Sequence, residues 1–364
     1  MSRIIIVDAH EDLAYNAAIL GRDYSRSVAG TRALEQGSRI VEQRDNTMLG
    51  WPEYQLGNIA IVFATLFVMP VAHATEATRK ASYRNPDEAR QLCLEQFDYY
   101  RQLVRNHPDK FIMISNAVEL QTLLAAWQEP VDSIEPFVGL VMLMEGAEGI
   151  RDPGELNEWW SMGLRVIGPA WLGTRYCGGT GGPGQLTRSG KELLREMAVF
   201  NFILDLSHMD EAAALESLGS YQGPIIASHS NAAALLPGNP GNRHLSDAVI
   251  QALVDRNGVI GVVPYNEFLQ TGWKKSDGRQ GISLGFLVDH IDHICQLAGN
   301  ASHVGLGTDF DGGFGFESVP AELDSIADLQ MLVPMLSDRG YSIGDIEAVL
   351  GTNFIGLLQR SLPA

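Results

Sequence analysis

The sequence predicts an α/β fold made of a single (β/α)8 barrel with a metal site at the carboxyl ends of its strands. Three observations support this prediction. Eight runs are mostly apolar on both faces, as are strands of a parallel sheet buried on both sides. Segments with helical spacing of apolar residues lie between these runs. Histidine or carboxylate side chains follow five of the runs, and in such a barrel all strands end on one face.

The length of the chain and its lack of divisions favour one domain. The chain has 364 residues, which is within the range of one barrel. No strong internal repeat, low-complexity tract or linker interrupts it. We therefore expect a single domain over residues 1–364.

The first half of the chain contains two long predicted strands. Residues 4–12 are an apolar run that ends in a histidine and an aspartate, and a second strand covers about residues 58–69. Residues 13–50 between them are polar and irregular, and we expect a long excursion on the strand 1 side of the fold. A helix start signal stands at residues 85–88 (NPDE). Residues 111–114 are short and favour an accessory strand.

The second half alternates strands and helices more regularly. The predicted strands are residues 137–144, 164–169, 202–208, 224–229, 258–263 and 303–309. The predicted helices are residues 189–200, 210–218, 246–256 and 285–298, followed by two more that close the chain. The glycine-rich residues 178–184 lack the lysine of a phosphate-binding loop, so we expect a mobile loop at the barrel rim.

Composition excludes several classes of function. The net charge is −18, from 26 basic and 44 acidic residues. That charge argues against nucleic acid and against an anionic membrane surface as partners. Three distant cysteines predict neither a disulfide framework nor a CxxC zinc site. No secretory signal or anchor is recognisable, and residues 59–69 are too short to span a bilayer, so we expect a cytoplasmic protein.

The polar residues at the strand ends form the candidate site. They are His10, Asp12, Glu145, His208, His229 and Asp309. Imidazole and carboxylate ligands suit zinc or a similar divalent ion. Three histidines with the carboxylates exceed the needs of one catalytic zinc, and they suffice for two metals if one carboxylate bridges. A two-metal site can activate a shared water for hydrolysis.

Each of these residues also has a purely structural interpretation. A lone histidine at a strand end is commonly a hydrogen-bonded structural residue, and an acidic residue there commonly caps the next helix. Their convergence on one predicted face favours the metal site. His290 and His293 lie within a predicted helix, where packing is the simpler interpretation. The remaining histidines, expected at the surface or in loops, are His73, His107, His244 and His303.

At these residues the sequence resembles the membrane dipeptidase (renal dipeptidase) family, peptidase family M19 of the amidohydrolase superfamily. The matching stretches are residues 7–13, 144–146, 185–197, 204–208, 228–232, 243–247 and 305–312. They span nearly the whole chain in the order of the family.

The resemblance implies a role for each residue of a site with two zinc ions. His10 and Asp12 would hold one metal, His208 and His229 the other, and Glu145 would bridge them. Asp309 matches the acid/base residue of the family. Arg243 matches the arginine that binds the free carboxylate of the substrate, a role that suits the guanidinium fork. For Arg243 alone a loop salt bridge is an equal alternative, and for Asp311 we favour a structural role in its loop.

The sequence departs from the mammalian members of the family at one position of the pocket. A histidine that helps to position the substrate there is replaced by Trp171, whose indole offers one N–H donor but cannot ionise. We name Trp171, Arg175 and Tyr176 as candidates that shape the substrate pocket, with packing at the rim as the alternative.

These observations lead to a main hypothesis and two competitors. The main hypothesis is a zinc-dependent dipeptidase in which a hydroxide between the metals attacks the peptide bond, including bonds to a C-terminal D-residue. A second hypothesis keeps the metals but changes the substrate to an N-acyl amino acid, a lactam or another small amide. A third is a non-catalytic metal-binding relative. A homodimer is an expectation from the family resemblance alone.

Overall fold

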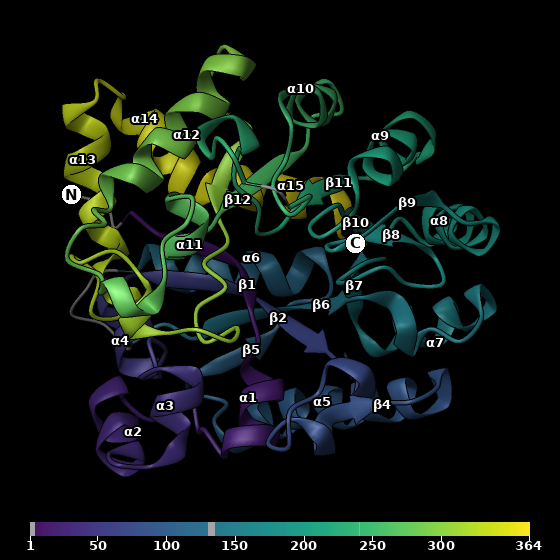
Figure 1. Ribbon diagram of the computed structural model, residues 1–364, viewed down its shortest axis with the longest axis horizontal. Coiled ribbons are helices and arrows are strands. Elements are labelled where there is room, and N and C mark those ends of the chain that lie inside the picture. Colours follow the sequence, from purple (N-terminus) through teal and green to yellow (C-terminus); the bar gives the residue numbers. More distant parts are fainter. Residues whose placement is uncertain (1–3, 130–134, 240) are drawn as a thin grey trace.

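The computed structural model describes residues 4–129, 135–239 and 241–364, and its centre is a closed barrel of parallel strands (Figure 1). The barrel closes because β2 pairs with β1 on one side and with β6 on the other. In order around the barrel, the strands are β1 (Ile6–Glu11), β2 (Ile59–Phe67), β6 (Val138–Glu145), β7 (Leu164–Gly168), β10 (Ile203–Asp205), β11 (Ile225–Ala227), β12 (Val259–Val262) and β13 (Val304–Leu306). The predicted (β/α)8 fold class is confirmed.

Strand β6 pairs with three other strands, β2, β5 and β7. Its first residues pair with the short strand β5 (Phe111–Met113), and its last residues pair with β7 on the same side. The predicted accessory strand is therefore confirmed. Every residue of β6 is buried, because the barrel interior and the outer helices cover its two faces.

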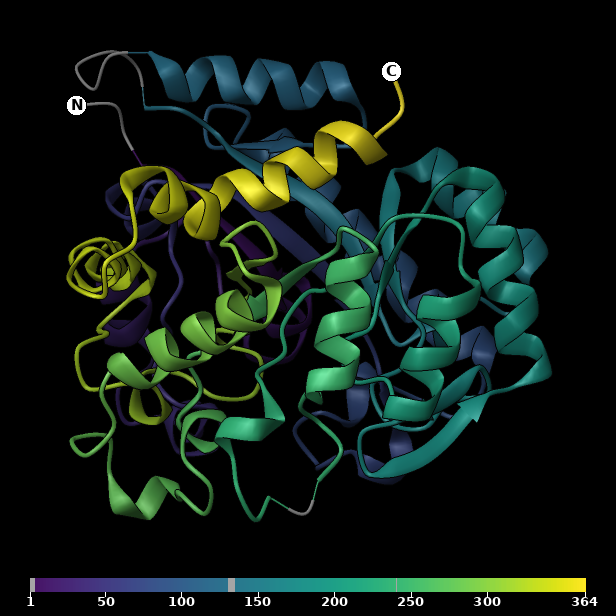
Figure 2. The ribbon, with the colours of Figure 1, turned by 90° about the horizontal axis from the view of Figure 1, so that it is seen from above.

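Helices surround the barrel, as Figures 1 and 2 show. The helices that follow β2, β5, β6 and β7 are α5 (Pro86–Asn106), α6 (Ala117–Gln128), α7 (Leu156–Met162) and α8 (Arg188–Phe200). The later ones are α9 (Glu211–Ser220), α10 (Asp247–Asp255), α11 (Asn266–Leu269), α12 (Gly285–Ala298), α13 (Leu332–Asp338), α14 (Ile343–Glu347) and α15 (Asn353–Ser361). Asn85 and Ser246 cap α5 and α10 through their side chains, as their sequences predict.

The segment between β1 and β2 is more regular than expected. The structure places α1 (Leu13–Leu20), α2 (Val28–Glu35), α3 (Arg39–Arg44) and α4 (Trp51–Leu56) in or directly after residues 13–50. The expectation of an irregular excursion is therefore wrong. Short helices with Gly21 and Gly37 at positive φ leave a weak periodic signal, and their stability comes from contacts with distant residues.

One such contact is the carboxylate of Asp311, which lies beyond β13. It accepts hydrogen bonds from the backbone N–H of Met48 at 2.9 Å, the hydroxyl of Thr47 at 2.5 Å and the hydroxyl of Tyr24 at 3.1 Å. The guanidinium of Arg22 pairs with it at 2.9 Å. This buried carboxylate fastens residues 22–48 to the carboxyl end of the barrel. The structural role expected for Asp311 agrees with these contacts.

The glycine-rich residues 178–184, expected to form a loop, belong to a β-hairpin. Its antiparallel strands are β8 (Cys177–Gly179) and β9 (Gly182–Leu186). A Cβ atom on Gly178 would lie 2.2 Å from the backbone nitrogen of Gly184, so the glycines allow the two strands to approach. A second small pair joins β3 (Met69–Pro70) to β4 (Ser82–Tyr83).

The last helix of the chain, α15, packs against the barrel beside α6 (Figure 2). Phe354, Leu357 and Leu358 of α15 are buried in the cluster that contains the interior faces of β1, β2 and β6. In the part of the chain that the structure describes, no helix combines the length and the apolar character needed to cross a membrane.

Candidate metal centre

Strand β1 brings two of the predicted ligands to the mouth of the barrel. Its β-branched residues are completely buried, and the strand is joined to β13 through Asp8. The carboxylate of Asp8 accepts hydrogen bonds from the backbone N–H of Thr308, at 2.7 Å, and from the Thr308 hydroxyl. These bonds fix the register at which His10 and Asp12 emerge. The Nε2 atom of His10 lies 4.0 Å from the nearer carboxylate oxygen of Asp12.

The two carboxylate oxygens of Glu145, the last residue of β6, face different partners. Its Oε2 atom lies 3.8 Å from Nε2 of His10. Its Oε1 atom lies 3.1 Å from Nε2 of His208 and 3.4 Å from Nε2 of His229. The Nε2 atoms of these two histidines are 3.0 Å apart. Glu145 therefore stands between two groups of potential ligands.

A hydrogen-bond chain fixes the orientation of His229. The carboxylate of Asp205 accepts the hydroxyl hydrogen of Ser228 at 2.5 Å, so the Ser228 oxygen accepts from Nδ1 of His229 at 2.7 Å. With its hydrogen on Nδ1, His229 presents the lone pair of Nε2 to Glu145 and His208. Thr180 of the β8–β9 hairpin makes a comparable contact with Nδ1 of His208, at 2.9 Å.

Burial favours the neutral form of each of these groups. It lowers the pKa of His10 to about 3, and it lowers the pKa values of His208 and His229 well below normal. Burial likewise raises the pKa of Asp12 to about 7 and that of Glu145 well above its usual range. Neutral histidines are the form that binds metals, and a cation nearby would return both carboxyl groups to their ionised form.

The residues fit a divalent cation because several of their polar atoms are buried without a partner. Both ring nitrogens of His10 and the Oδ1 atom of Asp12 have no hydrogen-bond partner among the described residues. Such atoms are costly unless something binds them. Two sets of described residues lie close enough to share one ion, namely His10 with Glu145 and His229, and His10 with Asp12 and Asp309.

Asp309 follows β13 and faces the same centre. Its Oδ1 atom lies 4.0 Å from Nε2 of His10, and its backbone has a positive φ of 56°. Burial raises the pKa of Asp309 well above normal, and the negative charge of Asp12 adds to this effect. A Cβ atom on Gly312 would lie 1.9 Å from Oδ1 of Asp309, so the glycine provides the space that the carboxylate occupies.

Arg243 is buried beside the centre, and hydrogen bonds to His229 and Ser230 hold its guanidinium in place. One terminal nitrogen donates to the backbone carbonyl of His229 at 2.6 Å, and the other donates to the hydroxyl of Ser230 at 3.1 Å. Its Nε atom has no partner in the described structure, and the guanidinium lies over the ring of Phe268 at 5.1 Å. A fixed cation of this kind can receive an anionic group of a ligand.

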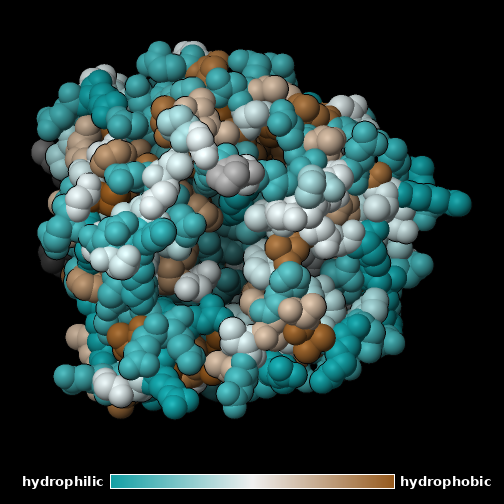
Figure 3. Space-filling view, in the orientation of Figure 1, coloured by the Kyte–Doolittle hydropathy of each residue, from teal (hydrophilic) through white to brown (hydrophobic). Residues whose placement is uncertain are grey.

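A cavity of about 240 Å³ opens above these residues, and the face shown in Figure 3 is hollowed near its centre. The cavity is lined by Asp12, Tyr15, Arg44, Phe67, Met69, Glu145, Trp171, His208, Arg243, Tyr265, Phe268, Asp309, Gly312, Gly313 and Phe314. Most of the predicted site residues are therefore brought together, and Trp171 stands at the cavity wall beside Phe67, with ring centres 5.0 Å apart.

Tyr176 and Arg175, the other two candidates for shaping the substrate pocket, contact backbone carbonyls outside the cavity. Tyr176 is buried, does not line the cavity, and donates its hydroxyl hydrogen to the carbonyl of Ile150. Arg175 donates to the carbonyl oxygens of Glu148, at 3.0 Å, and Ile150, at 2.5 Å, and is likewise outside the lining. These contacts fix the loop after β7, which carries Trp171.

Several lining residues are absent from the prediction. Arg44 and Tyr15 come from the segment after β1. Tyr265 and Phe268 come from the connection after β12, which includes α11, and Phe314 comes from the loop after β13. The sequence contains a weak indication of a role for Tyr265, because it stands two residues beyond a predicted strand. Asp205 and Ser228 do not line the cavity but support His229, and their positions within three residues of a predicted histidine ligand are a stronger indication.

Three of the other histidines have hydrogen-bond partners elsewhere in the fold. His290 accepts a hydrogen bond from the backbone N–H of Ala232 at 3.2 Å, and His293 pairs with Asp247 at 2.8 Å. This agrees with helix packing. His303 is buried, with its Nδ1 in contact with the carbonyl of Gly258 at 2.9 Å, and it lies in the turn before β13, so the expected loop position is confirmed for it.

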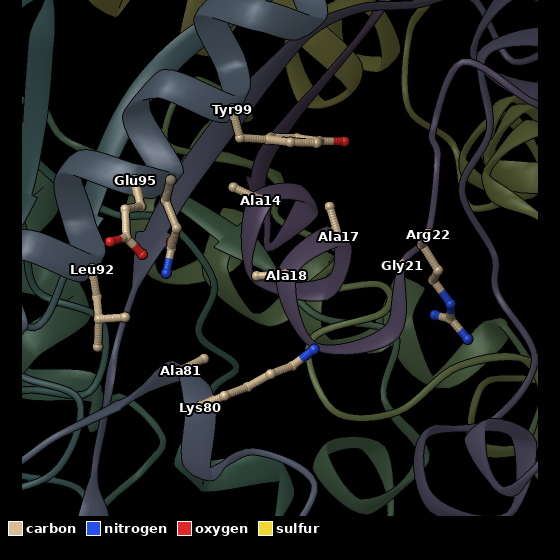
Figure 4. A pocket seen from close by; sticks show the side chains of 11 residues that line it. Ala14, Ala17, Ala18, Gly21, Arg22, Lys80, Ala81, Leu92, Glu95 and Tyr99 are labelled. Carbon is tan, nitrogen blue, oxygen red and sulfur yellow. The ribbon is translucent and has the colours of Figure 1, made fainter.

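A second cavity of about 470 Å³ lies outside the barrel between α1 and α5 (Figure 4). Ala14, Ala17 and Ala18 form one wall, and Leu92 and Tyr99 form part of the other. None of the predicted ligands lines it. The smaller cavity is therefore the one associated with the candidate chemistry.

The closed barrel, with imidazole and carboxylate groups gathered at the carboxyl ends of its strands, defines a metal-dependent hydrolase of the (β/α)8 class. Comparison with known families then narrows the assignment. The chain belongs to the membrane dipeptidase family, peptidase family M19, whose model matches residues 1–361.

Individual relatives agree with this assignment. An uncharacterised protein encoded in the pqqA 5′ region of Klebsiella pneumoniae is 34% identical over 235 residues, which are 61% of this chain and 82% of that protein. The dipeptidase ataJ of Aspergillus terreus is 25% identical over 99% of this chain and 85% of its own. A metallopeptidase of Rhodobacter sphaeroides, solved with a phosphinate mimic of the dipeptide L-Ala-D-Ala, has the same fold, with a TM-score of 0.76 and 22% identity over 98% of this chain and 99% of that one.

Proposed function

We propose that the protein is a zinc-dependent dipeptidase whose centre binds two metal ions. His10 and Asp12 would hold one ion, His208 and His229 the other, and Glu145 would join them. The observation that carries the proposal is the position of Glu145, whose two oxygens face separate groups of ligands. The relatives named dipeptidases support a dipeptide as the substrate.

The metal ions and the residues of the cavity would have different roles in catalysis. Divalent cations bound here would supply Lewis acidity at the scissile carbonyl and lower the pKa of water. Arg243 would hold the C-terminal carboxylate of the substrate, because it is a fixed cation with an unpartnered Nε atom at the cavity. That contact favours a free carboxylate one residue beyond the bond, and hence dipeptides over longer chains.

Asp309 would move the proton. It lies at the centre, and burial holds its pKa above normal, which favours uptake of a proton by its carboxylate. It would take a proton from the attacking water and pass it to the leaving amine. The indole of Trp171 would bound the substrate on the side of β7.

The test is a screen of dipeptides beside N-acyl amino acids, with and without added zinc. Matched L-L, L-D and Gly-D dipeptides would show whether a D-residue is accepted, as the L-Ala-D-Ala mimic bound by the Rhodobacter protein suggests. Cleavage of dipeptides with about two metal ions bound per chain supports the proposal. Cleavage of N-acyl amino acids alone would replace the substrate class and keep the centre.

Replacement of Arg243 gives a sharper test of substrate binding. We expect Arg243→Lys to raise KM for dipeptides about tenfold or more, because an ammonium cannot reproduce the guanidinium fork. Amides without a carboxylate should be affected much less. The metal content of the variant should equal that of the unmodified protein, and an equal loss on both kinds of substrate would contradict the assigned role.

A further inference from the structure

A second arginine enters the cavity from a different part of the chain. Arg44 is the last residue of α3 and lines the cavity together with Arg243. Its guanidinium lies over the loop that carries Asp309, because a Cβ atom on Gly313 would be 3.3 Å from its Nη1 atom. The predicted ligands and acid/base residue do not include it.

Within the described parts of the chain, no ion pair neutralises the positive charge of Arg44. Among the described residues, no carboxylate oxygen lies within 4.0 Å of its guanidinium, although most other arginines that are partly buried have one or bond to backbone carbonyls. It is near enough to Asp12 and Tyr15 to oppose the rise that burial causes in the pKa of each. Asp12, however, faces His10 and the proposed metal, so it is committed elsewhere.

The backbone next to Arg44 is firmly held, so the guanidinium is presented by a fixed support. The side chain of Asp45 accepts hydrogen bonds from the backbone N–H of Gly315 at 3.1 Å and from the hydroxyl of Ser318 at 2.6 Å. The carbonyl of Asp45 accepts from Arg22 at 2.9 Å. An arginine on a fixed backbone loses less freedom when it binds an anion than an arginine on a mobile loop does.

The two arginines enter the cavity beside different parts of the centre. Arg243 follows β11 and donates to the carbonyl of His229, whereas Arg44 belongs to the connection from β1 to β2 and approaches Gly313 in the loop after β13. Glu145, whose two oxygens face His10 on one side and His208 and His229 on the other, also lines the cavity. A dipeptide whose C-terminal carboxylate is at Arg243 and whose peptide bond is at the centre would extend its N-terminal residue toward Arg44.

We propose that Arg44 binds the side-chain carboxylate of the N-terminal residue, and that the enzyme prefers dipeptides that begin with aspartate or glutamate. This inference rests on the proposed dipeptidase function. If two divalent ions occupy the centre, they would more than neutralise Asp12, Glu145 and Asp309. The charges of Arg44 and Arg243 are then available to a substrate with two carboxylates.

The experiment compares substrates that differ in one charge. Initial rates are measured on Glu-Ala and Gln-Ala, and on Asp-Ala and Asn-Ala, with the unmodified enzyme and with Arg44→Gln. We expect the unmodified enzyme to favour the acidic member of each pair about tenfold or more in kcat/KM, mainly through KM. Arg44→Gln should lower kcat/KM on acidic dipeptides by roughly 10- to 100-fold and change it less than about threefold on neutral ones.

Two controls keep the outcome specific. Arg39→Gln removes the same charge from the same helix, at an exposed residue outside the cavity lining, and should leave both members of each pair unchanged. Arg44→Lys retains the charge and should retain part of the preference. Metal content and melting temperature are compared for all variants, so that a fold defect is recognised.

The outcomes separate this inference from the proposed function. An equal loss on acidic and neutral dipeptides, or no loss on either, overturns the role of Arg44 while dipeptidase activity stands. If the unmodified enzyme cleaves no dipeptide, calorimetric titration of the Asp309→Asn variant with Glu-Ala and Gln-Ala still tests whether Arg44 binds the acidic side chain. Tighter binding of Glu-Ala that is abolished by Arg44→Gln supports the inference, and equal or undetectable binding of the two overturns it.

Discussion

At the scale of single residues, the centre depends on side chains that do not themselves face the cavity. Ser228 is the clearest case, because its hydroxyl group links Asp205 to His229 and thereby fixes which ring nitrogen of the histidine carries hydrogen. A ligand that is already oriented binds metal without paying for a rotation or a change of tautomer. The quality of the proposed site therefore depends on hydrogen bonds behind the ligands.

Replacement of Ser228 tests that dependence. We expect Ser228→Ala to weaken retention of one metal ion by roughly 10- to 100-fold, because Nδ1 of His229 loses its partner. Competition with a graded series of chelators measures the change. Ser302→Ala, at an exposed position, serves as the control, and equal metal retention in both variants would argue against the orienting role.

Gly312 offers a second test at this scale. Because a Cβ atom there would lie 1.9 Å from Oδ1 of Asp309, Gly312→Ala should displace the carboxylate from its position. We expect kcat to fall about 100-fold, the usual cost of misplacing a catalytic group by about 1 Å, with metal content unchanged. Gly281→Ala is the matched control, since a Cβ atom on Gly281 meets nothing within 4 Å. A kcat that is unchanged in Gly312→Ala would remove Asp309 from its proposed role.

At the scale of elements, the segment between β1 and β2 behaves as part of the active site. Its helices are short, yet the buried carboxylate of Asp311 binds residues 22, 24, 47 and 48 of the segment at once. Asp311 lies only two residues after Asp309. The segment that presents Arg44 and the loop that presents the acid/base residue are therefore joined by one side chain.

Removal of this carboxylate should have a large effect on stability. We expect Asp311→Ala to lower the free energy of unfolding by about 3–5 kcal/mol, because it leaves the guanidinium of Arg22 and the hydroxyl groups buried without their acceptor. Urea unfolding followed by circular dichroism measures the change. Asp324→Ala breaks an ion pair with Arg32 at an exposed carboxylate, and it should cost less than about 1 kcal/mol. Equal effects of the two variants would contradict the fastening role of Asp311.

At the scale of the whole molecule, the sequence predicts the barrel and the ligand positions better than the connections. His10 and Glu145 lie at the ends of β1 and β6, and His208 and Asp309 stand three residues after β10 and β13. Local sequence therefore determines both the strand and the place where the side chain emerges. Arg44 could not be placed in this way, because its position depends on bonds to residues about 270 positions away. The hairpin at residues 177–186 was missed because close packing of glycines, and not β-propensity, allows it.

Buried histidines outside the centre predict the acid response of the fold. Burial lowers the pKa of His290 to about 4 from an ordinary value of 6.5, so the unfolded chain binds the proton more readily below pH 6.5. The stability contribution of His290 is therefore complete above pH 6.5 and is lost as pH falls toward 4, at about 1.4 kcal/mol per pH unit. In metal-free protein, His290→Gln should reduce the dependence of unfolding free energy on pH between 6 and 4.5 by up to one proton. An unchanged slope would show that His290 is already protonated in the folded state.

The way Asp311 fastens the segment after β1 has a consequence for how such enzymes diversify. Residues 13–56 supply a wall of the cavity but none of the barrel strands. Such a segment can be exchanged as a cassette between barrels, provided that the partners of Asp311 and Asp45 are transferred with it. Substrate preference could then change in evolution, or in a chimaera made in the laboratory, while the catalytic strands keep their sequence.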